Sequence, residues 1–181
     1  EMDLISDDEY KDALVFILDT AEKLLVSDER YLLGKEVIIF DHHLNLTNID
    51  NTYFYHKPNW ISCSEMVADF GLNQNMIFNE YTASVLYAGI VADSGRFQYI
   101  NNENGEHALL ISSKMVSLGA DIKSLYDYLY VESLENRVAK AKFAKFESTL
   151  EGVAYRFNTQ QDVLDSGFDF MFVSRGTLGS M

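Results

Sequence analysis

Two short apolar runs, each followed by an aspartate, constrain the fold of this 181-residue chain more than any other feature. The run "ALVFIL" leads to Asp19, and the run "VIIF" leads to Asp41. Continuous apolar runs of this length are typical of strands that are buried on both faces of a parallel sheet. The segment 20–35 between them is long enough for a right-handed crossover and contains helix-forming residues. We therefore predict an α/β fold with a parallel sheet and flanking helices.

The residues after these runs predict several helices. Ser62 precedes an apolar stretch and predicts the N-cap region of a short helix. Residues 79–95 place small and apolar side chains at helical spacing, so that Asp93 falls at the end of a helix and Gly95 stops it. Residues 105–130 predict two further helices.

The remaining segments predict connections and a second unit. Residues 45–60 are rich in Asn and Thr and contain the only proline, a composition typical of an irregular connection. The run "RFQYI" predicts a short strand, and residues 132–150 predict a longer helix. Beyond it, "GVAYRFNT" and "FDFMFVS" predict two strands that begin a different unit.

Carboxylates and imidazoles follow both predicted strands at the point where each strand ends. His42 and His43 come directly after Asp41, and Asp19 follows the first strand. Open parallel sheets place ligand sites in the crevice at the carboxyl ends of their strands. We expect these four side chains to face that crevice and Asp93 to join them from the end of a helix. Carboxylates with neutral imidazoles suit a divalent ion such as Mn2+ or Mg2+.

Each of these residues also has a purely structural interpretation. Adjacent histidines can simply follow a strand and cap a turn, Asp19 can begin a turn, and Asp93 can end a helix without binding a ligand. His56 beside the proline and His107 within a helix are more often surface residues, and we assign neither a function.

The composition limits the partners and the location of the protein. Fourteen basic residues against 28 acidic residues give a net charge of −14. That charge argues against broad contact with long nucleic acids, because their binding depends on neutralising phosphates. Cys63 is the only cysteine, so neither an intrachain disulfide nor a cysteine-based zinc site is expected. No apolar run reaches the roughly 20 residues that span a bilayer, and the acidic start does not resemble a signal peptide. We expect a soluble, cytoplasmic protein.

Four motifs in order resemble those of the Asp-His-His (DHH) phosphoesterase family. "VIIFDHHLN" resembles the family signature and "VFILDTA" its second motif, while "ISCSEM" resembles its Ser-rich helix start and "YAGIVADSGRFQY" its fourth motif. The resemblance covers residues 11–99, and the helical stretch to about residue 147 is also similar to the family. Within the family, the bacterial nanoRNase and 3'-phosphoadenosine 5'-phosphate (pAp) phosphatase branch is the most similar.

The resemblance implies a role for each candidate residue. It implies that Asp19 bridges two Mn2+ ions, with Mg2+ as the alternative metal, and that His42 and Asp93 ligate one of these ions. His43 would contact the scissile phosphate, and Asp41 would orient an imidazole.

Two further residues are expected to bind the substrate. Arg96 would hold a phosphate, although it can equally pair with a nearby acid, and Ser62 would contact the substrate from the start of its helix.

The activity implied is hydrolysis of short oligoribonucleotides or pAp by two-metal activation of water. A cyclic dinucleotide phosphodiesterase and a family II inorganic pyrophosphatase are the alternatives within the family, and "SEM" with "AGIVADSGRFQY" argues against the pyrophosphatase. A noncatalytic nucleotide-binding module is the alternative outside enzymes. A homodimer is possible at the family level only.

Two family features have no counterpart in the sequence. The first motif, which contains His, Pro and two Asp residues and supplies three further metal ligands, is missing, and so is a C-terminal Gly-Gly-Gly-His stretch. We therefore expect the chain to be the central part of a longer protein and to be inactive alone. The expected organisation is a DHH domain over residues 1–131, a connecting helix over 132–148 and the beginning of a smaller substrate-binding domain over 149–181.

Overall fold

The computed structural model describes residues 5–131, 133–135, 137–138, 148–150, 153–155 and 159–166. The chain divides into two compact units, Glu1–Leu125 and Tyr126–Met181. All of the candidate site residues lie in the first unit.

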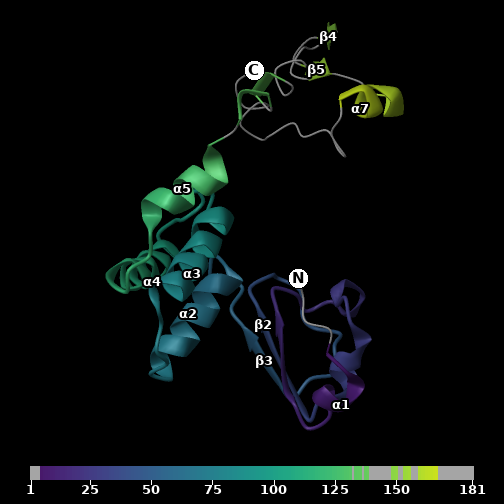
Figure 1. Ribbon diagram of the computed structural model, residues 1–181, viewed down its shortest axis with the longest axis vertical. Helices are drawn as coiled ribbons and strands as arrows, with labels where there is room; N and C mark the ends of the chain where they lie inside the picture. Colours follow the sequence, from purple (N-terminus) through teal and green to yellow (C-terminus); the bar gives the residue numbers. More distant parts are fainter. Residues whose placement is uncertain are drawn as a thin grey trace. The chain divides into compact units, whose positions relative to one another are not determined.

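A parallel three-stranded sheet forms the first part of the larger unit. Its strands are β1 (Leu14–Leu18), β2 (Glu36–Asp41) and β3 (Tyr53–His56), in the order β1-β2-β3. Both predicted strands are confirmed, and β2 lies in the centre of the sheet (Figure 1). The prediction of an irregular connection over residues 45–60 missed β3, whose run "YFYH" consists of aromatic residues that favour strands.

The crossover from β1 to β2 forms 3-10 turns. These are η1 (Lys23–Leu25) and η2 (Glu29–Leu33), and the short helix α1 (Asp7–Tyr10) lies beside η2. This layer covers one face of the sheet, where Ile17, Val37 and Ile39 form a buried cluster with Tyr31 and Ile49. β2 is largely buried on both faces, as its apolar run predicts. The prediction was wrong for the second face of β1, where Leu14, Phe16 and Leu18 are 51%, 44% and 49% exposed.

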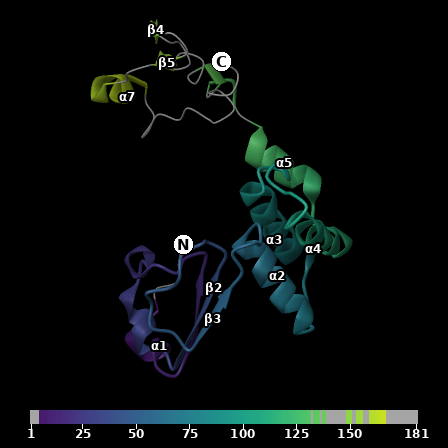
Figure 2. The ribbon, with the colours of Figure 1, turned by 180° about the vertical axis from the view of Figure 1, so that it is seen from behind.

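Four helices follow the sheet. They are α2 (Cys63–Asn73), α3 (Glu80–Asp93), α4 (Gly105–Ser117) and α5 (Ile122–Tyr130). The helices α2, α3 and α4 pack against one another, as both ribbon views show (Figures 1 and 2). The predictions of these helices are confirmed, including the break near Gly119, which adopts a left-handed φ of 99°.

The run "RFQYI" is a turn, so the prediction of a strand there was wrong. Gly95, Arg96 and Phe97 all adopt positive φ angles of 56°, 62° and 63°. The N–H of Arg96 donates to the carbonyl of Val91 at 2.8 Å, and the N–H of Phe97 donates to the Ser94 hydroxyl at 2.9 Å. These bonds close the C-terminus of α3, and a left-handed backbone is incompatible with an extended strand.

The described part of the second unit contains a two-stranded antiparallel ladder and a short helix. The ladder pairs β4 (Ser148–Leu150) with β5 (Val153–Tyr155), and α7 (Gln160–Ser166) follows. β5 agrees with the predicted strand "GVAYRFNT". The prediction of a helix over residues 132–150 was wrong at its end, because Ser148–Leu150 pair with β5 as a strand. Most of the rest of that predicted helix and the whole run "FDFMFVS" lie outside the described residues. No helix in the described ranges combines the length and the apolar character needed to cross a membrane.

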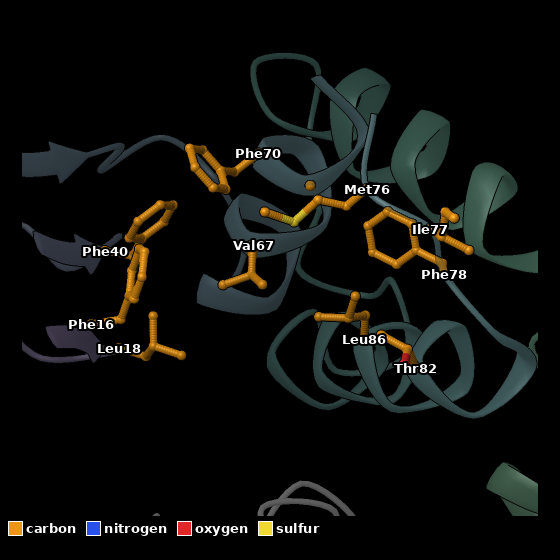
Figure 3. Close-up of a pocket in the computed structure, with 11 residues that line it drawn as sticks. Phe16, Leu18, Phe40, Val67, Phe70, Met76, Ile77, Phe78, Thr82 and Leu86 are labelled. Carbon is orange, nitrogen blue, oxygen red and sulfur yellow. The ribbon is translucent and has the colours of Figure 1, made fainter. Parts of the chain in front are cut away.

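The unit Glu1–Leu125 also contains an open apolar groove of about 430 Å3. Phe16, Leu18 and Phe40 on the sheet and Val67 and Phe70 on α2 line this groove (Figure 3). The rings of Phe40 and Phe70 pack edge to face, with centroids 5.3 Å apart. No side chain that lines it is titratable. Chemistry that needs acids, bases or metal ligands must therefore be sought at a different place in this unit.

Candidate metal centre at the carboxyl edge of the sheet

The turn after β1 holds Asp19 beside the end of β2. The N–H of Asp19 donates to the carbonyl of Phe40 at 2.9 Å, which continues the ladder between the strands by one bond. Asp19 adopts a left-handed φ of 65°. This conformation is uncommon outside glycine, although aspartate tolerates it better than most residues, and such residues concentrate at functional sites.

Asp19, His42 and His43 form a cluster that could hold a metal ion. One ligand atom from each residue lies within 4.8 Å of the others. The Nε2 atom of His42 is 3.4 Å from Oδ1 of Asp19, and the Asp19 side chain is 55% exposed. The donor set therefore fits a hard-to-borderline divalent cation that can reach the site from solvent. Among the described residues, this is the one group of such side chains with that geometry.

The imidazole of His42 is oriented by a backbone carbonyl. Its Nδ1 atom lies 3.2 Å from the carbonyl oxygen of Trp60. Because a carbonyl only accepts hydrogen bonds, Nδ1 is the donor in this contact. Nε2 faces Oδ1 of Asp19 and is the ring nitrogen that a metal ion beside Asp19 would reach. Histidines that ligate metals are commonly oriented in this way by a carbonyl or carboxylate at the other ring nitrogen.

His43 is held by the buried carboxylate of Asp41. Its Nδ1 atom is 2.6 Å from Asp41 Oδ1, and its backbone N–H donates to the same oxygen at 3.3 Å. The Asp41 side chain is 1% exposed. The hydrogen bond to Asp41 raises the pKa of His43, burial partly opposes this, and the charges of Asp19 and Asp93 add to it. His43 thus holds its proton more tightly than an ordinary histidine.

Asp93 lies at the end of α3, as its helical spacing predicted, and interacts electrostatically with the cluster. Partial burial raises its pKa, and the negative charge of Asp19 raises it further, while His42 and His43 oppose the shift. A carboxylate with a raised pKa beside a second carboxylate is a place where a cation would relieve repulsion.

The two predicted substrate-binding residues have different surroundings. Arg96 is exposed in the left-handed turn directly after α3. Ser62 is fully buried, and its hydroxyl accepts the N–H of Glu65 at 3.0 Å as the N-cap of α2. The N-cap prediction is confirmed, and in this structure Ser62 has a structural contact rather than an exposed surface.

A small cavity of about 160 Å3 opens beside the cluster. Asp19, Asp41 and His43 line it together with residues of the crossover and of the loop after β2. Two aspartates and an imidazole whose pKa is raised therefore share one concave surface. Reactive sites typically combine a cavity with groups of this kind.

Comparisons with known proteins show what the chain is similar to. No protein-family model matches the sequence. The chain is 33% identical over 149 residues to a Streptococcus mutans protein named as a probable bifunctional oligoribonuclease and PAP phosphatase NrnA, with 82% of this chain and 46% of that protein covered. It is 29% identical over 136 residues to the Bacillus subtilis protein named bifunctional oligoribonuclease and PAP phosphatase NrnA, with 74% and 42% covered.

A solved structure of an exopolyphosphatase-related protein from Bacteroides fragilis has the same fold. The two structures superimpose with a TM-score of 0.76 at 19% sequence identity. The superposition covers 94% of this chain and 51% of the Bacteroides fragilis chain. These relatives confirm the resemblance to the DHH phosphoesterases that the motifs indicate. The chain spans about half the length of the curated relatives it matches.

Behind the cluster, the structure reveals a polar network that the sequence did not predict. Nδ1 of His107 lies 2.6 Å from Oε1 of Glu65, although 42 positions separate the two residues. Glu65 is fully buried, and the His107 ring lies 3.9 Å from the ring of Trp60 between centroids. The helix-start motif "SCSEM" points to Glu65 as a helix-capping acid, but nothing in the sequence points to His107 as its partner.

Proposed function

We propose that this chain carries part of the active site of a metal-dependent phosphoesterase that hydrolyses short oligoribonucleotides or pAp. The single observation that carries the proposal is the cluster of Asp19, His42 and His43 at the carboxyl edge of a parallel sheet. The names of two relatives, which combine oligoribonuclease and PAP phosphatase, support the choice of substrate.

Asp19, His42 and Asp93 would hold Mn2+, or Mg2+ in its place. The fit rests on the chemistry of the donors, since two carboxylates and the lone pair of His42 Nε2 suit such an ion. When bound, such ions lower the pKa of a coordinated water and offset negative charge on a phosphate.

His43 would bind the scissile phosphate and supply a proton to the leaving oxygen. Its Nδ1 proton is held by Asp41, so the proton that can be transferred sits on Nε2. Because Asp41 raises the pKa of His43, the imidazolium form persists to a higher pH than in an ordinary histidine. Arg96 would hold a second phosphate oxygen from the turn after α3.

A short substrate agrees with the charge of the chain. The net charge of −14 disfavours contact with many phosphates at once. A mononucleotide or a very short RNA needs only one local site, where metal ions and one or two cationic side chains offset the charge.

We further propose that the 181-residue chain does not turn over substrate alone. Its sequence has no counterpart of the family's first motif, and the single proline, Pro58, stands in a different context. The cluster described here would then form only part of a complete two-metal site.

The test is hydrolysis of pAp and of a short RNA with added Mn2+. The assay compares this chain with a longer version that carries upstream coding sequence including the first motif. We expect the longer version to hydrolyse both substrates and Asp19→Ala or His42→Ala to reduce the rate by about a hundredfold or more. Asp50→Asn, which removes an exposed acid away from the cluster, is the control.

Other outcomes lead to different conclusions. A longer version that binds nucleotide but never cleaves it would indicate a noncatalytic binding module. Cleavage of cyclic dinucleotides or pyrophosphate in place of pAp and RNA would assign the site to one of the other branches of the family.

A further inference from the structure

We infer that Glu65 is a positioning residue for the metal ligand His42, and that it acts through the single peptide group between Trp60 and Ile61. This inference rests on the proposed function, because it treats His42 as a metal ligand. It assigns a role to the network of Glu65 and His107 that lies behind the cluster.

The connection begins at a buried carboxylate with two partners. Oε2 of Glu65 accepts the N–H of Ile61 at 2.8 Å, and Oε1 lies 2.6 Å from Nδ1 of His107. The Glu65 side chain is 0% exposed. A buried carboxylate is costly unless both oxygens are satisfied, so these two contacts fix its position.

The N–H of Ile61 and the carbonyl of Trp60 belong to one peptide group. That group is planar, so its N–H and its carbonyl oxygen point in opposite directions and move as a rigid unit. Glu65 holds the N–H end, and the carbonyl end accepts the Nδ1 proton of His42 at 3.2 Å. The orientation of the Glu65 carboxylate therefore determines where the acceptor for His42 lies.

Contacts around Trp60 hold the same peptide from the other side. The backbone N–H of Trp60 donates to the carbonyl of Lys57 at 2.9 Å, and its ring packs on the His107 ring. His107 is thus joined to the peptide twice, once through Glu65 and once through the Trp60 ring.

The position of Glu65 in its helix supports a role beyond capping. In a capping box, an acid at this position would accept the N–H of the N-cap residue, which is Ser62 here. Glu65 accepts the N–H one residue earlier, at Ile61, and that is the peptide on which His42 depends. A carboxylate acceptor also polarises the peptide and strengthens its carbonyl as an acceptor.

The experiment compares Glu65→Met, which keeps the length of the side chain but removes both acceptors, with Glu65→Gln, which keeps one acceptor. The first readout is the tautomer of His42, measured by nitrogen-15 NMR without metal, at a pH about two units above the ordinary histidine pKa. The second is the affinity for Mn2+ alone, measured from the EPR signal of free Mn2+. Circular dichroism establishes that each variant is folded.

We expect the wild-type chain to carry the His42 proton on Nδ1. Glu65→Met should give a mixture of tautomers and bind Mn2+ about tenfold more weakly, as is typical when the support of a metal ligand is lost. Glu65→Gln should weaken binding about threefold, because a neutral acceptor forms a weaker hydrogen bond than a carboxylate. Asp69→Asn is the matched control, since Asp69 lies 3.5 Å from the other ring nitrogen of His107, whereas Glu65 accepts the N–H of Ile61.

A folded Glu65→Met variant with the wild-type tautomer and Mn2+ affinity would overturn the inference. So would an equal loss of Mn2+ affinity in Asp69→Asn. If Glu65→Met does not fold, Glu65→Gln decides, and an unchanged Mn2+ affinity overturns the inference. If the wild-type chain binds no Mn2+, the proposed metal centre fails in this chain, while the His42 tautomer still decides the role of Glu65.

Discussion

Asp41 and His43 form a 2.6 Å hydrogen bond at the end of β2, between a carboxylate that is 1% exposed and an imidazole that is 58% exposed. Asp41→Asn should keep the size of the side chain and an acceptor oxygen but remove the charge. We therefore expect the pKa of His43 to fall towards the ordinary histidine value, which an NMR titration of the metal-free protein measures.

The same pair predicts the pH dependence of stability. The folded pKa of His43 is raised above its unfolded value, so the stabilisation by Asp41 is fully present below the unfolded pKa of about 6.5. It is lost as the pH rises through the folded pKa. The difference in Tm between wild type and Asp41→Asn should therefore shrink with rising pH, and a difference that grows across that range would contradict the pairing.

Asp93→Asn should stabilise the metal-free protein at neutral pH. Partial burial and the charge of Asp19 raise the pKa of Asp93, so its ionised form is disfavoured in the folded state. The variant should become more stable than the wild type as the pH rises above the unfolded aspartate pKa, and the difference should reach roughly 1–3 °C in Tm. Added Mn2+ should stabilise the variant less than the wild type. A lower Tm for the variant at neutral pH without metal would show that the repulsion is absent.

The close contact of α2 with α3 predicts a destabilising substitution at Gly89. A Cβ atom there would lie 1.9 Å from Oγ and 2.7 Å from Cβ of Ser64, and rotating the Ser64 side chain relieves only the first contact. Gly89→Ala should cost about 1–3 kcal/mol in the free energy of unfolding, as overpacking does elsewhere. Gly105→Ala is the control, because its nearest neighbour would be Ile100 Cδ1 at 3.4 Å. Equal denaturant midpoints for the two variants would contradict the prediction.

Cys63 should be almost unreactive in the folded protein. Burial raises the pKa of its thiol to about 12, and Sγ donates to the carbonyl of Phe40 at 3.5 Å. Because the thiolate is the reactive form, modification by a coloured thiol reagent should be at least about a hundredfold slower than in denaturant. Rapid modification of Cys63 under native conditions would mean that the first turn of α2 opens readily.

Local sequence patterns predicted the elements that carry the site. The apolar runs before Asp19 and Asp41 specify strands, and the helical spacing before Asp93 specifies α3, because each pattern reflects burial of one continuous segment. The strand β3 was missed because its aromatic run stands among Asn, Thr and a proline, which are typical of loops. The turn at Arg96 was missed because three consecutive left-handed residues leave no signature in apolar periodicity.

The support of the site could not be predicted from local patterns. The contact of Glu65 with His107 joins residues 42 positions apart. The link from Glu65 to His42 passes through a backbone peptide, so it has no residue signature at all. Such connections depend on how α2 and α4 pack, which only the folded structure determines.

The central claim is that Asp19 and His42 form a metal centre, and Mn2+ binding tests it most directly. The measurement is an EPR titration of the purified chain with Mn2+, together with Asp19→Asn, His42→Ala and the control Asp50→Asn. We expect saturable binding of Mn2+ by the wild type and the control, and a loss of affinity of at least about tenfold in the other two variants. Equal affinity in all four proteins, or no binding by the wild type, would contradict the claim.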